Sequence, residues 1–193
     1  MATRISINID EVVKGLDKKK AASKKVVQRT IGDMRSRGPG WVSKAVREEY
    51  GVDAAEVKKS CHPGKYGGIS FGGEVVDNIA LIYKGRVLTP THFKMKPESR
   101  PKGKSYKVTA EIKKGRRKVL SSKAFLANAG KSGGKQIPFQ RTGESRLPIE
   151  AIKTVSVPQM IEDGNGNLKP KVDKAINENL EKRFNHYCKQ LLK

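Results

Sequence analysis

The sequence predicts an α+β fold, with N-terminal helices, a central antiparallel β-sheet or small sandwich, and an amphipathic C-terminal helix. Three observations predict it: apolar residues recur at helical spacing over residues 10–50, alternate with polar residues over 106–113, and recur at helical spacing after residue 170. Because helices and strands come in separate runs, the strands are expected to pair antiparallel. We treat residues 1–193 as one domain, with a helical region (1–60), a β-rich body (64–160) and a final helix (170–193).

The N-terminal region is expected to contain a short strand over residues 3–9 and then two helices. Asp10 stands where a helix N-cap would, and the apolar stripe after it predicts a helix over residues 10–37 that continues through a lysine-rich stretch. Gly38-Pro39-Gly40 is expected to end this helix, because proline removes a backbone donor and glycine favours a helix end. A second helix is predicted over residues 41–50.

The middle of the chain predicts β-strands. Apolar residues between Val75 and Tyr83 predict one strand, and the alternation from Tyr106 to Ile112 predicts the clearest half-buried strand. Lys114-Gly115-Arg116 predicts a hairpin turn, with residues 119–127 returning as the next strand. Two further strands are predicted at residues 137–141 and 149–157.

The last segment predicts an amphipathic helix. Its apolar residues fall on one stripe, and its acidic residues precede its basic ones, an order that suits the helix dipole. The stripe comprises Val172, Ile176, Leu180, Phe184, Tyr187 and Leu191.

A large positive charge is the main clue to function. The chain has 41 Lys and Arg against 19 Asp and Glu, a net charge of +22, whereas solubility needs only about 2–8. The candidate partners are nucleic acid, an anionic membrane surface and an acidic protein, and the alternative is a merely solvated surface. The candidate contacts with DNA or an acidic partner are Lys18, Lys19, Lys20, Lys24, Lys25 and Arg29 in one cluster, and Lys113, Lys114, Arg116, Arg117 and Lys118 in another. A third basic cluster comprises Lys94, Lys96, Arg100, Lys102 and Lys104.

No motif predicts catalysis, and we expect a protein that is not an enzyme and has no cofactor or metal. Gly130-Lys131-Ser132 resembles the end of a phosphate-binding loop, but Phe125 stands where that motif needs glycine. The adjacent pair Cys61-His62 is a poor nucleophile and base, since neighbouring side chains rarely face each other. Carboxylates that meet only in space stay an open alternative, as does an enzyme acting on nucleic acid. Because the chain has no long apolar run, we expect no membrane-spanning segment. Because its N-terminus lacks an apolar signal core, we expect no export.

Several segments of the second half together follow a pattern found in one family of phage proteins. They are Leu88-Thr89-Pro90-Thr91-His92-Phe93-Lys94-Met95-Lys96-Pro97, Tyr106 to Lys118, Ala124 to Ala127, Phe139 to Gly143, Arg146 to Ile149, and Val155 to Met160. In this order they resemble prophage minor tail protein Z over about residues 85–193. Many members carry Tyr-Gly-Pro before the last segment, where this chain has Ile152-Lys153-Thr154-Val155.

The resemblance implies a structural virion protein of the phage tail or neck. Such proteins form rings, expected to be hexamers, at the head-proximal end of the tail tube, where they help tail completion and head–tail joining. The implied partners are further copies and other tail or neck proteins (tube, terminator or connector), with nonspecific contact to DNA in the lumen. The implied location is the virion tail or neck, and the host cytoplasm during assembly. The alternative from charge alone is a basic nucleic-acid-binding protein of ribosomal or nucleoid type.

Overall fold

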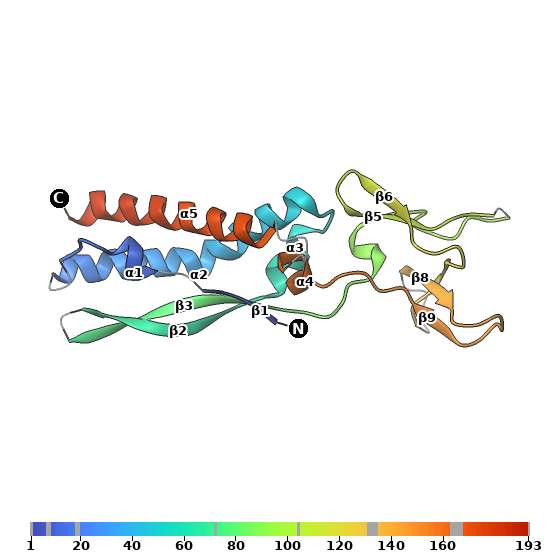
Figure 1. The fold of residues 1–193 in the computed structure, drawn as a ribbon, viewed down its shortest axis with the longest axis horizontal. Helices are drawn as coiled ribbons and strands as arrows, with labels where there is room; N and C mark the ends of the chain where they lie inside the picture. Colours follow the sequence, from blue (N-terminus) through green and yellow to red (C-terminus); the bar gives the residue numbers. More distant parts are fainter. Residues whose placement is uncertain are drawn as a thin grey trace.

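The computed structural model is an elongated molecule with a helical half and a β half (Figure 1). The structure describes residues 2–6, 9–17, 20–71, 73–103, 105–130, 135–162 and 168–192. In these residues the strands form three small antiparallel sheets, which together with the long helices confirm the α+β class.

The helical half has three layers, with the C-terminal helix α5 on helix α2 and α2 on a three-stranded sheet (Figure 1). The sheet order is β1-β3-β2, and the cross-strand pairs Ile5↔Leu81 and Thr3↔Tyr83 are buried. Most of the core lies between these layers. The elements of this half are β1 (Ala2–Ser6), α1 (Ile9–Val12), α2 (Ala21–Glu49), α3 (Ala54–Lys59), β2 (Cys61–Phe71), β3 (Glu74–Lys84), α4 (Val157–Ile161) and α5 (Leu168–Leu191).

Helix α2 runs without interruption through Gly38-Pro39-Gly40, so the expected helix end at residue 37 is wrong. A proline inside a helix costs about 3 kcal/mol. The helix nevertheless buries residues at a spacing of four on both sides of Pro39, namely Met34, Gly38, Val42 and Val46. Gly38 also lets the helix approach the sheet, because a Cβ at this position would lie 2.9 Å from Cδ1 of Leu81. Packing on both sides of α2 therefore outweighs the local helix-breaking preference.

The expected single helix over residues 10–37 is also wrong at its start. Helix α1 ends at Val12, Gly15 has φ +85°, and Lys20 takes an extended conformation before α2 begins at Ala21. The chain thus turns between two helices where the sequence pattern suggested one. Lys18 and Lys19 lie outside the described residues.

The β half consists of two small sheets of three strands each, ordered β4-β5-β6 and β7-β8-β9. The expected hairpin turn at Lys114-Gly115 is confirmed, and Gly115 has φ +72°. The expected single strand over residues 119–127 is not formed: strand β6 ends at Val119 in one sheet, and strand β7 begins at Phe125 in the other. The elements of this half are η1 (Pro90–His92), β4 (Lys94–Lys96), β5 (Thr109–Lys113), β6 (Arg116–Val119), β7 (Phe125–Asn128), β8 (Gln136–Arg141) and β9 (Ile149–Ala151).

The expected strand over residues 149–157 is only partly present, because β9 ends at Ala151 and helix α4 begins at Val157. Ser156 and Gln159 form a capping box: the Gln159 backbone N–H donates to Ser156 Oγ (3.3 Å), and the Ser156 backbone N–H donates to Gln159 Oε1 (2.8 Å). Pro158 follows the cap within the first turn, where its missing N–H has no helical partner to lose.

The two halves are joined by backbone hydrogen bonds as well as by the chain itself. Gly51 N–H donates to the Ile112 carbonyl (2.9 Å), and Lys114 N–H donates to the Glu49 carbonyl (2.8 Å). A Cβ at Gly51 would lie 2.6 Å from the Glu111 carbonyl oxygen, so only glycine allows this close approach. The joint holds the β5–β6 hairpin against the C-terminal end of α2.

Candidate polyanion-binding surface

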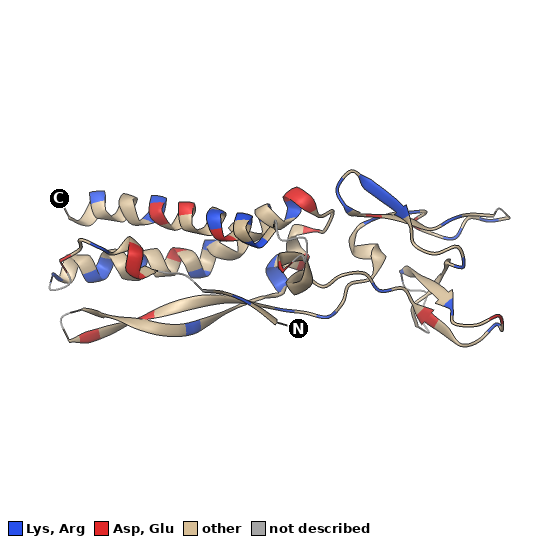
Figure 2. Ribbon diagram, viewed as in Figure 1, with Lys and Arg blue, Asp and Glu red and all other residues tan. Residues whose placement is uncertain are grey.

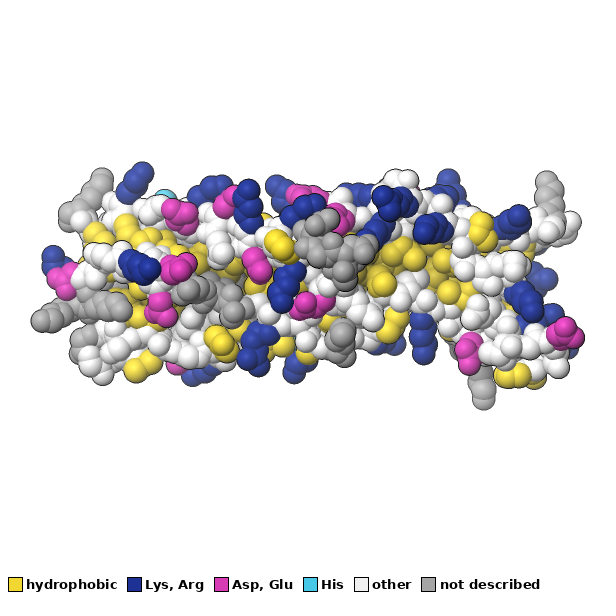
Figure 3. Space-filling model, in the orientation of Figure 1, with side chains coloured by type: hydrophobic (Ala, Val, Ile, Leu, Met, Phe, Trp, Pro, Cys, Tyr) yellow, Lys and Arg dark blue, Asp and Glu magenta, His cyan; other side chains and the backbone are white. Residues whose placement is uncertain are grey.

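The positive charge is concentrated in the β half. Residues 86–155 carry 18 Lys and Arg against 4 Asp and Glu, whereas the rest of the chain carries 23 against 15. Figure 2 shows the basic β6 strand and the few acidic positions of this half. On the face drawn in Figure 3, basic side chains surround exposed apolar surface over the same half.

Much of the first predicted cluster is engaged within the chain. Lys20 lies 4.0 Å from Asp17, and Lys24 forms an ion pair with Glu74 at the start of β3. The guanidinium of Arg29 lies 5.9 Å from the ring centroid of Tyr187 on α5. Lys25 is exposed. Of the four members that the structure describes, Lys20, Lys24 and Arg29 thus have electrostatic partners within the chain, so these four do not form one free patch.

The second predicted cluster is divided between internal contacts and solvent. Lys113 Nζ lies 5.4 Å from the Tyr50 ring centroid, and Arg117 Nη2 lies 3.6 Å from Glu111 Oε2. Arg117 Nη1 also donates to the Lys94 carbonyl (3.1 Å). Lys114, Arg116 and Lys118 are exposed and form no ion pair among the described residues, whereas Arg117 is exposed but engaged with Glu111.

A cleft at the junction of the two halves gathers six basic side chains. It has a volume of about 780 Å³ and also contains Asp53, Glu98 and Glu111. We call it the waist cleft; its basic residues are Arg47, Lys94, Lys96, Lys114, Arg117 and Lys135. These residues come from α2, β4, the β5–β6 hairpin and the segment before β8. The basic clusters of the sequence contain Lys94, Lys96, Lys114 and Arg117. They do not contain Arg47 and Lys135, which only the fold brings to the cleft.

A second cleft, of about 840 Å³, lies between the two small sheets. Tyr106 and Phe125 contribute rings, and the guanidinium of Arg141 lies 5.9 Å from the Phe125 ring centroid. Leu147, at the rim, is 67% exposed, and every residue from 141 to 150 is exposed. This projecting β8–β9 arm presents an apolar side chain among arginines.

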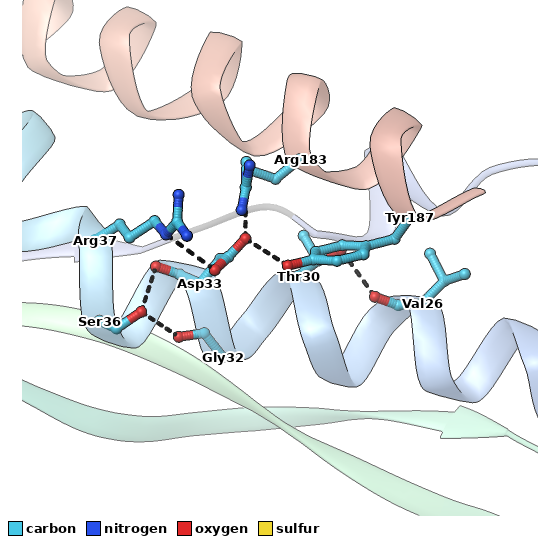
Figure 4. A network of polar contacts seen from close by, with 8 residues as sticks. All are labelled: Val26, Thr30, Gly32, Asp33, Ser36, Arg37, Arg183 and Tyr187. Carbon is cyan, nitrogen blue, oxygen red and sulfur yellow. Dashed lines mark hydrogen bonds and ion pairs between the residues drawn. The ribbon is translucent and has the colours of Figure 1, made fainter. Parts of the chain in front are cut away.

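Asp33 is the centre of a charged network between α2 and α5 (Figure 4). Its Oδ2 accepts hydrogen bonds from Arg183 Nε (2.5 Å) and Tyr187 Oη (2.8 Å), and Arg37 Nε lies 3.2 Å from Oδ1. Burial alone raises the pKa of Asp33, but the hydrogen bonds from Arg183 and Tyr187 and the charges of both arginines lower it below its ordinary value of 3.8. The carboxylate is satisfied by its own chain, so its role is to fix α5 on α2.

The residues considered for catalysis are not brought together as a pair. Cys61 and His62 are consecutive in strand β2, so their side chains point to opposite faces. Burial raises the pKa of the Cys61 thiol, a change opposite to the one that activates a nucleophile. Lys131 and Ser132 of the loop resembling a phosphate-binding motif lie outside the described residues.

In the part of the chain that the structure describes, no cluster of His, Cys, Asp and Glu could hold a metal ion, and no helix is long and apolar enough to cross a membrane.

No family model, curated protein or solved structure matches this chain. Its function is therefore inferred from its residues and geometry, together with the resemblance described above.

Proposed function

We propose that the protein is a structural subunit of a phage tail or neck, which forms a ring at the head-proximal end of the tail tube. There it helps to complete the tail and to join it to the head, in contact with tube, terminator or connector proteins. The resemblance of residues 85–193 to prophage minor tail protein Z supports this role, and so does the construction of the β half.

The observation that carries the proposal is the small core of the β half. Among the described residues, the core cluster of this half that is separate from the helical half has three buried side chains, Met95, Val108 and Leu126, with Tyr106, Leu120 and Ala124 partly buried against them. A unit of this size rarely gains enough stability from such a core alone, and small units commonly obtain the rest by oligomerisation. We infer that neighbouring subunits supply the missing burial.

Exposed apolar side chains support the same inference. Among the residues that the structure describes, four of the seven large apolar residues that are exposed lie in the β half: Val87, Val119, Leu147 and Ile149. Strand β6 is exposed along its whole length, and the β8–β9 arm projects from the end of the rod (Figure 1). Projecting strands with unpaired edges and apolar tips suit contacts between copies. The better packed helical half then provides a rigid base, and six copies is the number that the resemblance implies.

Assembly is tested by measuring particle mass and by electron microscopy of the purified chain at about 0.1 and 0.5 M salt. We expect rings of one diameter, and we expect Leu147→Asp to abolish them, because a charge then replaces the most exposed apolar side chain of the arm. Leu192→Asp is the matched control: Leu192 is 37% exposed and directly follows helix α5, whose C-terminal end lies at the opposite end of the molecule from the β8–β9 arm (Figure 1).

Because tail proteins often assemble only on a template, particles released by the strain that encodes the chain are analysed as well. Wild-type protein should copurify with tails, and Leu147→Asp should not. A chain that stays monomeric and is missing from these particles would contradict the proposal.

The second candidate, a basic nucleic-acid-binding protein, is favoured by the charge of the β half. It requires no assembly. Monomers that bind free duplexes tightly, together with absence from released particles, would favour it over the tail role.

A further inference from the structure

We propose that the waist cleft binds the phosphate backbone of duplex nucleic acid without reading its sequence. The site goes beyond the tail role and does not depend on ring formation, because all its residues belong to one chain. It also differs from the sequence prediction, which gave equal weight to the lysine-rich N-terminal cluster.

The first argument is the gathering of basic groups without internal partners. Among the described residues, the amino groups of Lys94, Lys96, Lys114 and Lys135 form no ion pair, although all four line the same cleft. Bringing like charges together raises the electrostatic energy unless an anion lies between them. The cleft is thus most stable when it holds a polyanion.

The acidic residues of the cleft do not cancel this charge. Glu111 is already engaged, since its Oε2 lies 3.6 Å from Arg117 and its Oε1 accepts a hydrogen bond from the Gly115 backbone N–H (3.0 Å). Asp53 and Glu98 are the other carboxylates of the lining. Six basic groups therefore face three acidic ones, of which one is paired within the site.

The spacing of the lysines suits a nucleic-acid strand. Lys94 and Lys96 are exposed on the same face of β4, while Met95 between them is buried. Residues two apart in a strand are separated by about 6.6–6.8 Å. Phosphates of one DNA strand rise by about 3.4 Å per step along the helix axis and also wind around it, so neighbouring phosphates are farther apart than this rise. The two amino groups can therefore reach neighbouring phosphates of one strand.

The kind of basic residue favours phosphate over an acidic protein. Residues 86–155 contain 12 lysines and 6 arginines. Lysine is depleted in protein–protein interfaces, where the planar guanidinium of arginine is preferred, but it serves well as a point charge for phosphate. The aromatic residues of the cleft, Tyr50 and Phe93, are buried, so no ring is free to stack on unpaired bases. A duplex held by its backbone is the ligand that these features fit.

The test is fluorescence anisotropy of a labelled 20-base-pair duplex of mixed sequence, titrated with the full chain at about 50–200 mM salt. In the site variant, Lys94, Lys96, Lys114 and Lys135 are changed to Gln. In the control variant, the exposed Lys25, Lys44, Lys59 and Lys182 of the helical half are changed to Gln, which removes the same net charge.

We expect the site variant to bind at least tenfold more weakly, whereas the control stays within about threefold of wild type. In a plot of log affinity against log salt, the magnitude of the slope should fall by about 0.9 for each lost phosphate contact, so by up to about 3.6 in the site variant. An equal loss of duplex affinity in the two variants would show that only the overall charge matters, and it would overturn the proposed binding site. No duplex binding by the wild type would overturn it as well. So would binding of a polyglutamate peptide in place of the duplex, which would indicate an acidic protein partner.

A second measurement does not depend on the variants. Lysine acylation of the wild type, mapped by mass spectrometry with and without the duplex, should show protection of the four cleft lysines and none of Lys25. Unchanged labelling of the cleft lysines would refute the site even if the duplex binds. Leu147→Asp is expected to keep duplex affinity while losing assembly, so failure of the ring proposal and failure of this site give different results.

Discussion

Replacing Asp33 by Asn tests whether the charged network fixes helix α5 on α2. The substitution keeps the size of the side chain and an acceptor for Tyr187, but it removes the negative charge that Arg183 and Arg37 share. The Arg183 side chain is 27% exposed and Asp33 is 11% exposed, so this contact is partly shielded from water. The Arg37 side chain is 56% exposed, so its contact is largely screened.

The magnitude follows from these exposures. A hydrogen bond to a charged group contributes about 1.5–3 kcal/mol when shielded, and an exposed ion pair contributes about 0.2–1 kcal/mol. Taking the lower part of the first range, because Arg183 still meets solvent, Asp33→Asn should lower the free energy of unfolding by about 2 kcal/mol. For a chain of this size, that loss lowers Tm by about 4–8 °C.

The assay is urea denaturation at pH 7, followed by far-UV circular dichroism and by fluorescence of Trp41, the single tryptophan, which lies on α2. The control is Asp77→Asn, whose partner Lys65 is 75% exposed and whose own side chain is 52% exposed. It should change stability by less than about 0.5 kcal/mol. Equal stabilities of wild type and Asp33→Asn at pH 7 would refute the reasoning, as would an equal loss in the control.

The pH dependence gives an independent check. The pKa of Asp33 is lowered in the folded chain, so its stabilisation is fully present above its ordinary pKa of 3.8. It is lost as the pH falls from that value through the lower folded pKa. The stability difference between wild type and Asp33→Asn should therefore be constant from pH 5 to 7 and shrink below about pH 4. A difference that grows on acidification would contradict the assigned direction.

Three further substitutions test the joint, the cap and the core, each by urea denaturation. Gly51→Ala should destabilise by about 1–3 kcal/mol, because the new Cβ would lie 2.6 Å from a backbone oxygen, whereas Gly40→Ala, whose nearest atom is 4.0 Å away, should be neutral or stabilise by up to about 1 kcal/mol. Ser156→Ala removes the hydroxyl of the α4 capping box and should cost about 1 kcal/mol; no change would show that the cap is dispensable. Leu180→Ala should cost about 2–5 kcal/mol, because Leu180 is fully buried in the core of the helical half, and a loss below 1 kcal/mol would contradict that packing.

Features that depend on local pattern could be predicted from the sequence. The final helix was expected over residues 170–193 and runs over Leu168–Leu191, because its apolar stripe repeats at helical spacing from end to end. The turn at Lys114-Gly115 followed from the positive φ that glycine readily adopts. The strand predicted from Val75 to Tyr83 is β3.

The errors fall where distant residues decide the outcome. Gly38-Pro39-Gly40 is a helix-breaking sequence, but the buried surface of α2 on both sides outweighs it. The apolar residues from Met34 to Val46 keep their helical spacing on both sides of Pro39, and this spacing is a signal in the sequence that indicates the continuous helix. The break between β6 and β7 gave no comparable signal, because it depends on which sheet each segment joins.

The sequence by itself determined the α+β class, the excess of positive charge and the helix at the C-terminus, because composition and short-range periodicity are properties of neighbouring residues. Only the tertiary structure decided which charges meet. It paired Asp33 with Arg183 across 150 positions, engaged Lys24 and Arg29 within the chain, and placed Lys135 beside Lys94 in the waist cleft. Electrostatic interactions depend on distance and burial, and folding sets both by bringing together residues that the chain order keeps apart.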